Sequence, residues 1–191
     1  VQNELTKMTS NSPYGISKAA SHGAVDLYRR SYGLFAVAGI LFNHESPLRG
    51  DNFVSRKSTK WIGGFVKNNK SLINYQKLKL GNIEAVRDFG YSKEFVECMW
   101  MMLQQDKPKD YVVGTGIPTT VREFLDYCFE VIGIKDWSNY VEIDKGLFRN
   151  CEVEFLCADP SLIEKELGWK AKVTARELAN IMVEADIERL K

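Results

Sequence analysis

Tyr14 and Lys18 are the residues of this sequence whose types and spacing most directly suggest chemistry. On a helix, side chains four residues apart share one face and lie about one turn from each other. A phenol ordinarily loses its proton near pH ~10, and a neighbouring ammonium stabilises the phenolate by Coulomb attraction. Tyr14 beside Lys18 is therefore a candidate general acid or base near neutral pH.

The residues around this pair predict the helix that it requires. Ser12 is a suitable N-cap, and Pro13 suits the first helical position. Apolar residues then recur at helical spacing as far as Tyr32. A simpler interpretation stays open on spacing alone, in which Tyr14 packs at the start of a helix and Lys18 is a solvated charge.

A second tyrosine and lysine with the same spacing, Tyr75 and Lys79, provide an internal control. They lie in a segment whose apolar and polar residues alternate, which is typical of a strand. Positions four apart on a strand are roughly 13 Å from each other. We therefore expect no direct coupling between Tyr75 and Lys79.

The elements that must position these residues alternate between helices and strands, which predicts an α/β fold. Gly114-Thr115-Gly116 is interpreted as an ordinary turn between a strand and a helix, because Thr119 stands where a phosphate loop needs a third glycine. Capping-box sequences at 120–123 and 174–177 predict two helix starts, and glycines at 33, 133 and 168 predict helix ends. Helices are expected at 13–32, 54–67, 92–104, 120–133, 159–168 and 174–190. Strands are expected at 34–42, 72–80 and 111–113, and loops at 43–52 and around Arg87 and Asp88.

The composition restricts the class of protein. A chain of 191 residues fits one domain or a large part of one, and 26 basic against 25 acidic residues argue against a broad nucleic-acid surface. No apolar run approaches the ~20 residues of a membrane helix, and the start lacks a signal-peptide pattern. The four cysteines form no CxxC pair. We expect buried free thiols, no metal site and a cytoplasmic location.

Five stretches carry a resemblance to a known family: SPYGISK, FNHESPLRGDNFVSRK, LGNIEAVRDFGYSKEFVECMW, VVGTGIPTTVREF and FRNCEVEFLCADPSLIEKELGW. Together they closely resemble the GDP-mannose 4,6-dehydratases, which are extended short-chain dehydrogenase/reductase enzymes. The resemblance covers nearly the whole chain but only about the C-terminal half of such an enzyme. The chain begins with Val1, so it is either processed or a piece of a longer protein, and the resemblance favours the second interpretation.

The resemblance implies a partial NAD(P)-binding Rossmann-like fold of the α/β class, without the N-terminal dinucleotide-binding βαβ units. Residues 1–52 would be the C-terminal part of the Rossmann-like domain and would include the tyrosine helix. Residues 53–191 would be mainly a smaller α/β region that binds the sugar nucleotide. Cut off from its upstream strands, the segment 34–42 would expose a sheet edge, so we expect aggregation, self-association or partner binding.

The resemblance also assigns roles to individual residues. Tyr14 and Lys18 match the catalytic tyrosine and its lysine, and the same two residues contact NADP together with His44 and Arg49. The alternatives are a neutral imidazole capping the strand end for His44 and a solvent-exposed charge for Arg49. The positions that match contacts to the GDP-sugar are Asn43, Lys57, Arg87, Arg149 and Glu152. The alternative is simple surface charge for Lys57 and Arg87, and a weak surface ion pair for Arg149 with Glu152.

The implied function is the conversion of GDP-mannose to GDP-4-keto-6-deoxy-mannose, by internal hydride transfer through NADP and loss of water. The chain alone is expected to be inactive, and the implied partners are a second copy of the chain or a complementing N-terminal half. Two alternatives stay open. One is a non-catalytic remnant that binds a GDP-sugar or a partner, and the other is a sugar-nucleotide epimerase or reductase of the same superfamily.

Overall fold

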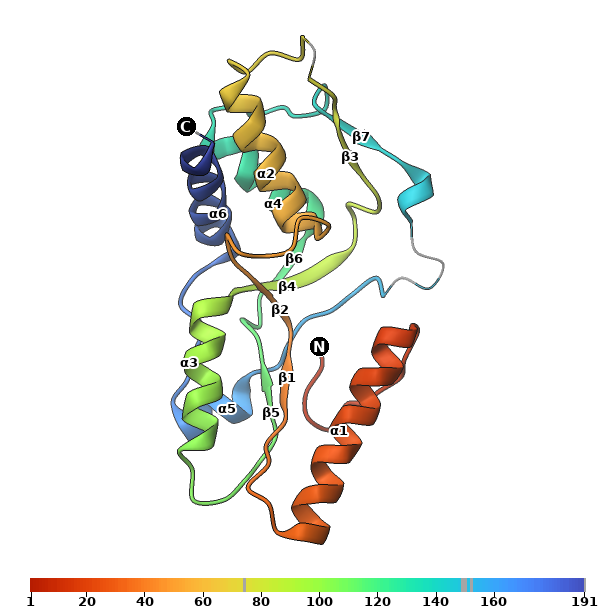
Figure 1. The fold of residues 1–191 in the computed structure, drawn as a ribbon, viewed down its shortest axis with the longest axis vertical. Coiled ribbons are helices and arrows are strands. Elements are labelled where there is room, and N and C mark those ends of the chain that lie inside the picture. The colour runs from red at the N-terminus through yellow and green to blue at the C-terminus, as the bar shows by residue number, and fades with distance from the viewer. Residues whose placement is uncertain (74, 149–150, 152, 191) are drawn as a thin grey trace.

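The computed structural model describes residues 1–73, 75–148, 151 and 153–190. Within these residues, helices and short strands alternate along an elongated molecule (Figure 1). The elements in chain order are α1 (Pro13–Tyr32), β1 (Gly39–Leu41), β2 (Asn43–Glu45), α2 (Val54–Lys67), β3 (Leu78–Leu80), β4 (Val86–Tyr91), α3 (Ser92–Leu103), β5 (Tyr111–Val113), β6 (Pro118–Thr120), α4 (Val121–Val131), β7 (Val141–Ile143), a 3-10 turn (Lys145–Leu147), α5 (Ser161–Leu167) and α6 (Ala175–Arg189).

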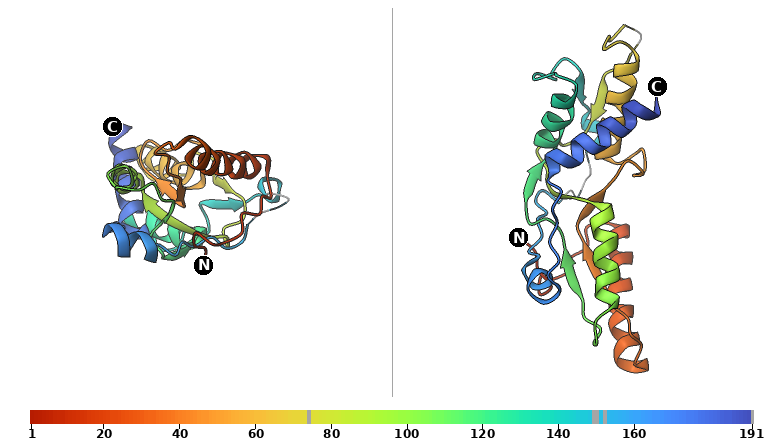
Figure 2. Two further views of the ribbon diagram at one scale, coloured as in Figure 1. Left: turned by 90° about the horizontal axis from the view of Figure 1, so that it is seen from below. Right: turned by 90° about the vertical axis from the view of Figure 1, so that its left-hand side faces the viewer.

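The strands of the described residues form three small sheets. β1 pairs in parallel with β5, and β3 pairs in parallel with β7. The third sheet has the order β2-β4-β6, with β2 parallel and β6 antiparallel to β4. Because β2 follows β1 after one residue, the first and third sheets continue into each other along the molecule (Figures 1 and 2).

Two hydrophobic clusters stabilise the two ends of the molecule. The larger one lies among α2, α4, α6, β3 and β7 and includes Phe65, Phe129 and Met182, all fully buried. The smaller one joins α3, β5 and α5 through Phe95 and Trp169. Residues after 53 contribute to both clusters, so the clusters do not mark a boundary between residues 52 and 53. The proposed division of the chain at that point stays a prediction.

Local chemistry explains the predicted helix ends. The Ser12 hydroxyl accepts a hydrogen bond from the Gly15 amide at 3.0 Å, Pro13 begins α1, and Gly33 ends it with a φ of 64°. α4 and α6 both begin with a complete capping box, as their sequences predict. α5 ends at Gly168, whose φ is 67°. These helices follow from residues within a few positions of each terminus.

The strands differ more from expectation. Only residues 39–41 of the apolar run 34–42 form a strand, because the Ala38 amide donates to the Asp110 carboxylate at 2.7 Å instead of to a neighbouring strand. Residues 43–45, predicted as the start of a loop, form β2 by pairing with β4. The segment 72–80 is a strand only at its end, since Tyr75 and the backbone of Gln76 hydrogen-bond to Trp61 of α2.

α1 makes few apolar contacts with the rest of the described chain. None of its residues is buried, and it lies along one side of the molecule (Figure 1). Arg29 attaches its C-terminal end by donating to the Ala36 carbonyl at 2.8 Å and by pairing with Asp110. β1 likewise pairs with β5 alone among the described strands. The surfaces of α1 and of this sheet edge are thus open, as expected for a fold that lacks neighbouring strands.

The cysteines are all free, and three of them, Cys98, Cys128 and Cys157, are buried. Cys151 is exposed, so the expectation of buried thiols was wrong for this residue. No described helix combines the length and the apolar character needed to cross a bilayer. Among the described residues, no group of three or more His, Cys, Asp or Glu side chains could hold a metal ion.

Candidate functional site

The first turn of α1 brings Tyr14 and Lys18 together. The Lys18 Nζ lies 5.5 Å from the centre of the Tyr14 ring, so the two groups share one helix face. Both side chains are exposed, Tyr14 by 71%. In water, two charges 4 Å apart attract each other by only about 1 kcal/mol, against about 4 kcal/mol at a partly buried site. The geometry of the pair is in place, but strong coupling requires that another segment cover it.

The control pair behaves as its spacing predicts. The Tyr75 hydroxyl donates to the Trp61 carbonyl at 2.8 Å, and burial raises the pKa of Tyr75. Lys79 instead pairs with Glu142 on the neighbouring strand at 3.3 Å. Tyr75 and Lys79 therefore have separate partners, and the spacing alone does not produce an acid–base pair.

His44 lies on β2, beyond the end of β1. Its Nδ1 is 2.8 Å from the Phe42 carbonyl oxygen, and its ring stacks on Phe95 with the ring centres 5.4 Å apart. A carbonyl can only accept, so Nδ1 carries the hydrogen of this bond. This hydrogen bond fits the simpler interpretation of an imidazole that caps the strand, and it also fixes the ring in one orientation.

Arg49 is not the solvent-exposed loop charge of the simpler interpretation, because its side chain is only 24% exposed. Its guanidinium lies over the Phe53 ring at 3.7 Å from the centre. Its Nε is 3.3 Å from Glu45, yet it is buried without a hydrogen-bond partner among the described residues. Glu45 itself is buried and accepts from the Ser55 hydroxyl. A partly buried guanidinium that makes an ion pair, but no hydrogen bond from Nε, is suited to an anionic ligand.

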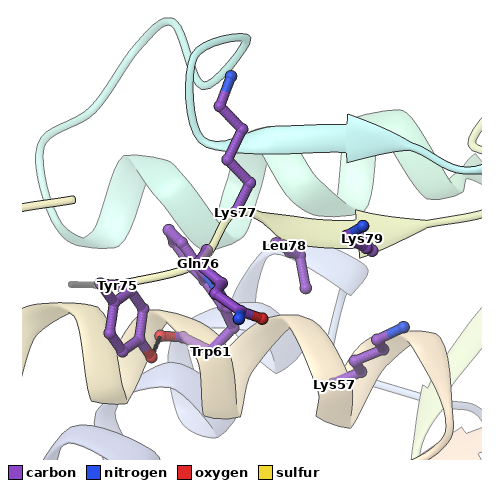
Figure 3. A pocket seen from close by; sticks show the side chains of 7 residues that line it. All are labelled: Lys57, Trp61, Tyr75, Gln76, Lys77, Leu78 and Lys79. Atoms are coloured by element: carbon purple, nitrogen blue, oxygen red, sulfur yellow. Dashed lines mark hydrogen bonds between the residues drawn. The ribbon is translucent and has the colours of Figure 1, made fainter. Parts of the chain in front are cut away.

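Lys57 lines a cavity of about 360 Å³ between α2 and the segment that leads into β3 (Figure 3). The Trp61 indole donates from Nε1 to the Gln76 carbonyl at 2.8 Å, and this bond holds the two walls together. In Figure 3 the Lys77 side chain extends away from α2. The residues around the cavity, three of them lysines and two of them aromatic, are Lys57, Trp61, Tyr75, Gln76, Lys77, Leu78 and Lys79.

Asn43 and Arg87 lie on neighbouring strands. Asn43 is opposite Phe89 in the β2–β4 register, which puts Arg87 two residues away along β4. The expected loop around Arg87 was wrong, because β4 is paired on both sides, by β2 and by β6. Arg87 donates to the Val86 and Val153 carbonyls at 2.7 and 2.8 Å. The predicted contacts Arg149 and Glu152 lie outside the described residues.

The residue that the sequence analysis missed is Asp88, which is fully buried on β4. Its carboxylate accepts hydrogen bonds from the Thr115 amide and hydroxyl and from the Gly116 and Ala158 amides, at 2.7 to 3.0 Å. The Gly114-Thr115-Gly116 turn therefore uses its amides for Asp88, which agrees with its interpretation as a turn and not as a phosphate loop. The available signal was an acidic residue between Arg87 and the apolar Phe89.

A buried ion pair connects helix α2 to the C-terminal helix α6. Arg56 on α2 pairs with Asp186 on α6, and their side chains are only 8% and 2% exposed. Thr59 also donates to Asp186, at 2.8 Å, and Arg189 donates to the Pro47 carbonyl at 2.5 Å. The last turns of α6 thus contact both α2 and the loop that carries Arg49.

Comparison with solved structures identifies the class of fold. The chain superimposes on RMD from Pseudomonas aeruginosa in complex with NADPH with a TM-score of 0.84 at 20% identity, covering 99% of this chain and 60% of that one. It superimposes on DesIV, a dTDP-glucose 4,6-dehydratase of Streptomyces venezuelae, with a TM-score of 0.82 at 22% identity, covering 98% and 56% of the two chains. The fold is the α/β fold of the short-chain dehydrogenase/reductases.

Sequence comparison then identifies the family. A family model described as GDP-mannose 4,6 dehydratase matches residues 1–182. GDP-mannose 4,6 dehydratase 1 of Arabidopsis thaliana is 49% identical over 100% of this chain and 51% of its own length. The Vibrio cholerae GDP-mannose 4,6-dehydratase is 37% identical over 98% of this chain and 56% of its own length. The chain belongs to the GDP-mannose 4,6-dehydratase family and spans about half the length of these curated relatives.

Proposed function

We propose that this chain is the C-terminal part of a GDP-mannose 4,6-dehydratase, a lyase that converts GDP-mannose to GDP-4-keto-6-deoxy-mannose. The observation that carries the proposal is the family match over residues 1–182, together with the juxtaposition of Tyr14 and Lys18 inside it. We further propose that the chain is active only with the upstream half, as part of a homo-oligomer or a complemented enzyme. Its buried free thiols support a location in the cytoplasm.

In this proposal Lys18 stabilises the phenolate form of Tyr14, which removes the proton of the substrate C4 hydroxyl and becomes a neutral phenol. The upstream half would cover α1 and exclude water, which strengthens the attraction between the two groups. NADP, when bound, would accept a hydride from C4 before water is lost across C5 and C6, and would return it to C6 afterwards. In the family, a glutamate upstream of Val1 assists that loss of water.

The residues proposed to hold the cofactor are Tyr14, Lys18, His44 and Arg49. The guanidinium of Arg49 supports this role. Its Nε is ion-paired with Glu45 but makes no hydrogen bond among the described residues, and a phosphate oxygen could accept a hydrogen bond from this group. The stacked and hydrogen-bonded His44 ring would line the same loop at the end of the sheet. Ligands of open α/β sheets bind beyond such strand ends.

The proposed contacts to GDP-mannose are Asn43, Lys57 and Arg87, with Arg149 and Glu152 outside the described residues. Lys57 borders a cavity with an aromatic wall and two further lysines, which suits a ligand with a planar base and phosphates. Arg87 is held by two backbone carbonyls in the strand next to Asn43. These positions provide the cations that a diphosphate needs.

Complementation tests the catalytic proposal. The chain is mixed with a polypeptide that supplies the upstream half, and the product from GDP-mannose is analysed by mass spectrometry. We expect loss of water only in the mixture and a drop of at least about 100-fold for Tyr14→Phe, since a positioned acid–base group contributes about 10²–10⁴-fold. Tyr28→Phe, on the same helix, should retain activity. Turnover by the chain alone, or a product that keeps its C6 hydroxyl, would contradict the proposal.

Titration calorimetry with GDP tests the substrate contacts separately. Lys57→Ala should weaken binding by about 10- to 150-fold, because a charge-assisted hydrogen bond contributes about 1.5–3 kcal/mol. Lys60→Ala is the matched control, since Lys60 lies on the same helix but pairs with Asp51. Equal effects of the two substitutions would exclude a specific role for Lys57. GDP binding without turnover in the complementation assay would instead support the non-catalytic alternative.

A further inference from the structure

Glu45 is a buried carboxylate to which the proposed function assigns no role. Its side chain is only 2% exposed, and the pairing of β2 with β4 fixes its backbone. The Ser55 hydroxyl, from the first turn of α2, donates to Glu45 Oε2. The positive end of the helix dipole favours a carboxylate near this end of α2. A strand and a helix therefore hold one carboxylate oxygen in place.

Arg49 is the cation that faces this carboxylate. Its Nε lies 3.3 Å from Glu45 Oε2, and its guanidinium lies over the Phe53 ring at 3.7 Å from the centre. The other carboxylate of the loop, Asp51, pairs with two cations of α2 instead. The ring fixes the plane of the guanidinium, and Glu45 fixes which edge of that plane turns inward. Two contacts thus set the orientation of Arg49.

The opposite edge of this guanidinium is available to a ligand. Among the described residues, neither Nη atom of Arg49 makes a hydrogen bond, and Nε is the atom of this side chain that is enclosed without one. The Nη atoms therefore reach solvent. A guanidinium held in this way presents N–H donors from its outer edge, in a geometry that suits the oxygens of a phosphate or diphosphate.

We propose that Glu45 is a positioning residue for the binding of a phosphoryl group by Arg49, because its carboxylate keeps the Nη edge of the guanidinium turned outward. The inference rests on the proposed role of Arg49 in holding the cofactor, and it adds the group that prepares Arg49 for that role. Glu45 acts through Arg49 and does not touch the ligand. Without the carboxylate, Arg49 keeps its charge but loses its fixed orientation, so the ligand has to order the side chain when it binds.

The charge of Glu45 acts on an anion in the opposite direction, which makes the sign of the result informative. A carboxylate that only neutralises Arg49 weakens its attraction for a phosphate, so removing that carboxylate strengthens binding. A carboxylate that orients Arg49 strengthens binding, so removing it weakens binding. We expect the second effect to dominate, because the ligand lies beyond the guanidinium and beside water, where its repulsion from Glu45 is screened.

The first test uses inorganic pyrophosphate as the probe and measures its affinity for the chain by titration calorimetry. Glu45→Gln keeps the size of the side chain and an acceptor for Ser55, and it should weaken binding by about 2- to 10-fold. Asp51→Asn is the matched control, since it removes one negative charge from the same loop and should change the affinity by less than about twofold. Tighter binding by Glu45→Gln, equal losses in the two variants, or no binding by the wild-type chain would overturn the proposal.

A double-mutant cycle separates positioning from a general structural effect. Arg49→Met should itself weaken pyrophosphate binding by about tenfold or more, because it removes a charge-assisted donor. Adding Glu45→Gln to Arg49→Met should then weaken binding no further, since the residue through which Glu45 acts is already absent. A merely structural role would lower the affinity by the same factor in both backgrounds, and that result would overturn the proposal.

Thermal unfolding of the same variants tests the contact without any ligand. Arg49→Met leaves the buried Glu45 carboxylate without its counter-charge, so Tm should fall by about 2–10 °C. Glu45→Gln/Arg49→Met removes both charges and should recover most of that loss. A double variant whose loss equals the sum of the two single losses would show that the two side chains are not coupled, and would overturn the proposal.

The inference and the proposed function can fail separately. NADPH fluorescence measures cofactor binding by the chain mixed with its upstream half. If Arg49→Met leaves the NADPH affinity unchanged while the pyrophosphate cycle is non-additive, Glu45 positions Arg49 but the proposed cofactor role of Arg49 is wrong. If Arg49→Met loses NADPH while Glu45→Gln weakens pyrophosphate binding equally in both backgrounds, the cofactor role stands and the positioning role is overturned.

Discussion

The buried ion pair between Arg56 and Asp186 offers a sharp test of how α6 stabilises the fold. Asp186→Ala leaves Arg56 buried without its counter-charge and removes the acceptor of the Thr59 hydroxyl. Breaking a buried pair from one side costs about 3–5 kcal/mol. For a chain of this size, each kcal/mol lowers Tm by about 2–4 °C, so Tm should fall by about 6–20 °C.

Thermal unfolding followed by circular dichroism measures this change. The matched control is Glu130→Ala. It breaks the ion pair between Glu130 on α4 and Arg176, which lies on α6 as Asp186 does. Those side chains are 60% and 58% exposed, so the cost should stay below about 1 kcal/mol. A second variant, Arg56→Met/Asp186→Leu, removes both charges and should recover most of the loss.

The outcome that contradicts this reasoning is a melting temperature of Asp186→Ala within about 2 °C of the wild type. That result would mean that water reaches the Arg56 side chain, so that the pair is not desolvated. A double variant as unstable as Asp186→Ala would mean that the site depends on its hydrogen bonds and not on the balance of charge.

Two further predictions concern packing and reactivity. Gly63→Ala should lower the free energy of unfolding in urea by about 1–3 kcal/mol, because the new Cβ would lie 2.9 Å from the Asp186 backbone. The control is Gly23→Ala on α1, where the Cβ meets open space and the change should be neutral or stabilising. Equal effects of the two substitutions would disprove the close approach of α2 and α6. Iodoacetamide at pH 8 should modify the exposed Cys151 in the native chain and spare Cys98, because burial raises the pKa of Cys98 to about 12. Rapid labelling of Cys98 in the native chain would contradict this and would show that α3 opens.

The helices of this fold could be predicted from the sequence because their signals are local. The Ser12–Pro13 start, the glycine stops and the two capping boxes each act within a few residues, and the structure confirms them. The strands depend on partners far along the chain. Asn43 begins β2 because β4 lies beside it, and residues 34–38 are not a strand because Asp110 takes the Ala38 amide. Neither partner is visible in the local pattern.

The candidate site divides in the same way. The proximity of Tyr14 and Lys18 follows from helical spacing alone, and the separation of Tyr75 from Lys79 follows from their non-helical segment. The burial of Arg49 could not be predicted, because it depends on Phe53 and Glu45 folding around it. The assigned roles of these residues stay predictions until binding and turnover are measured.

Asp88 has a consequence for the way this part of the molecule assembles. Its carboxylate loses its water only when the turn at Thr115 and the segment at Ala158 both supply their donors. A structure that contains one of these segments without the other would bury a partly unsatisfied charge, at a cost of several kcal/mol. Strand β4, the turn and the segment around Ala158 should therefore form and melt as one cooperative unit, although about 70 residues separate the ends of that unit in the sequence.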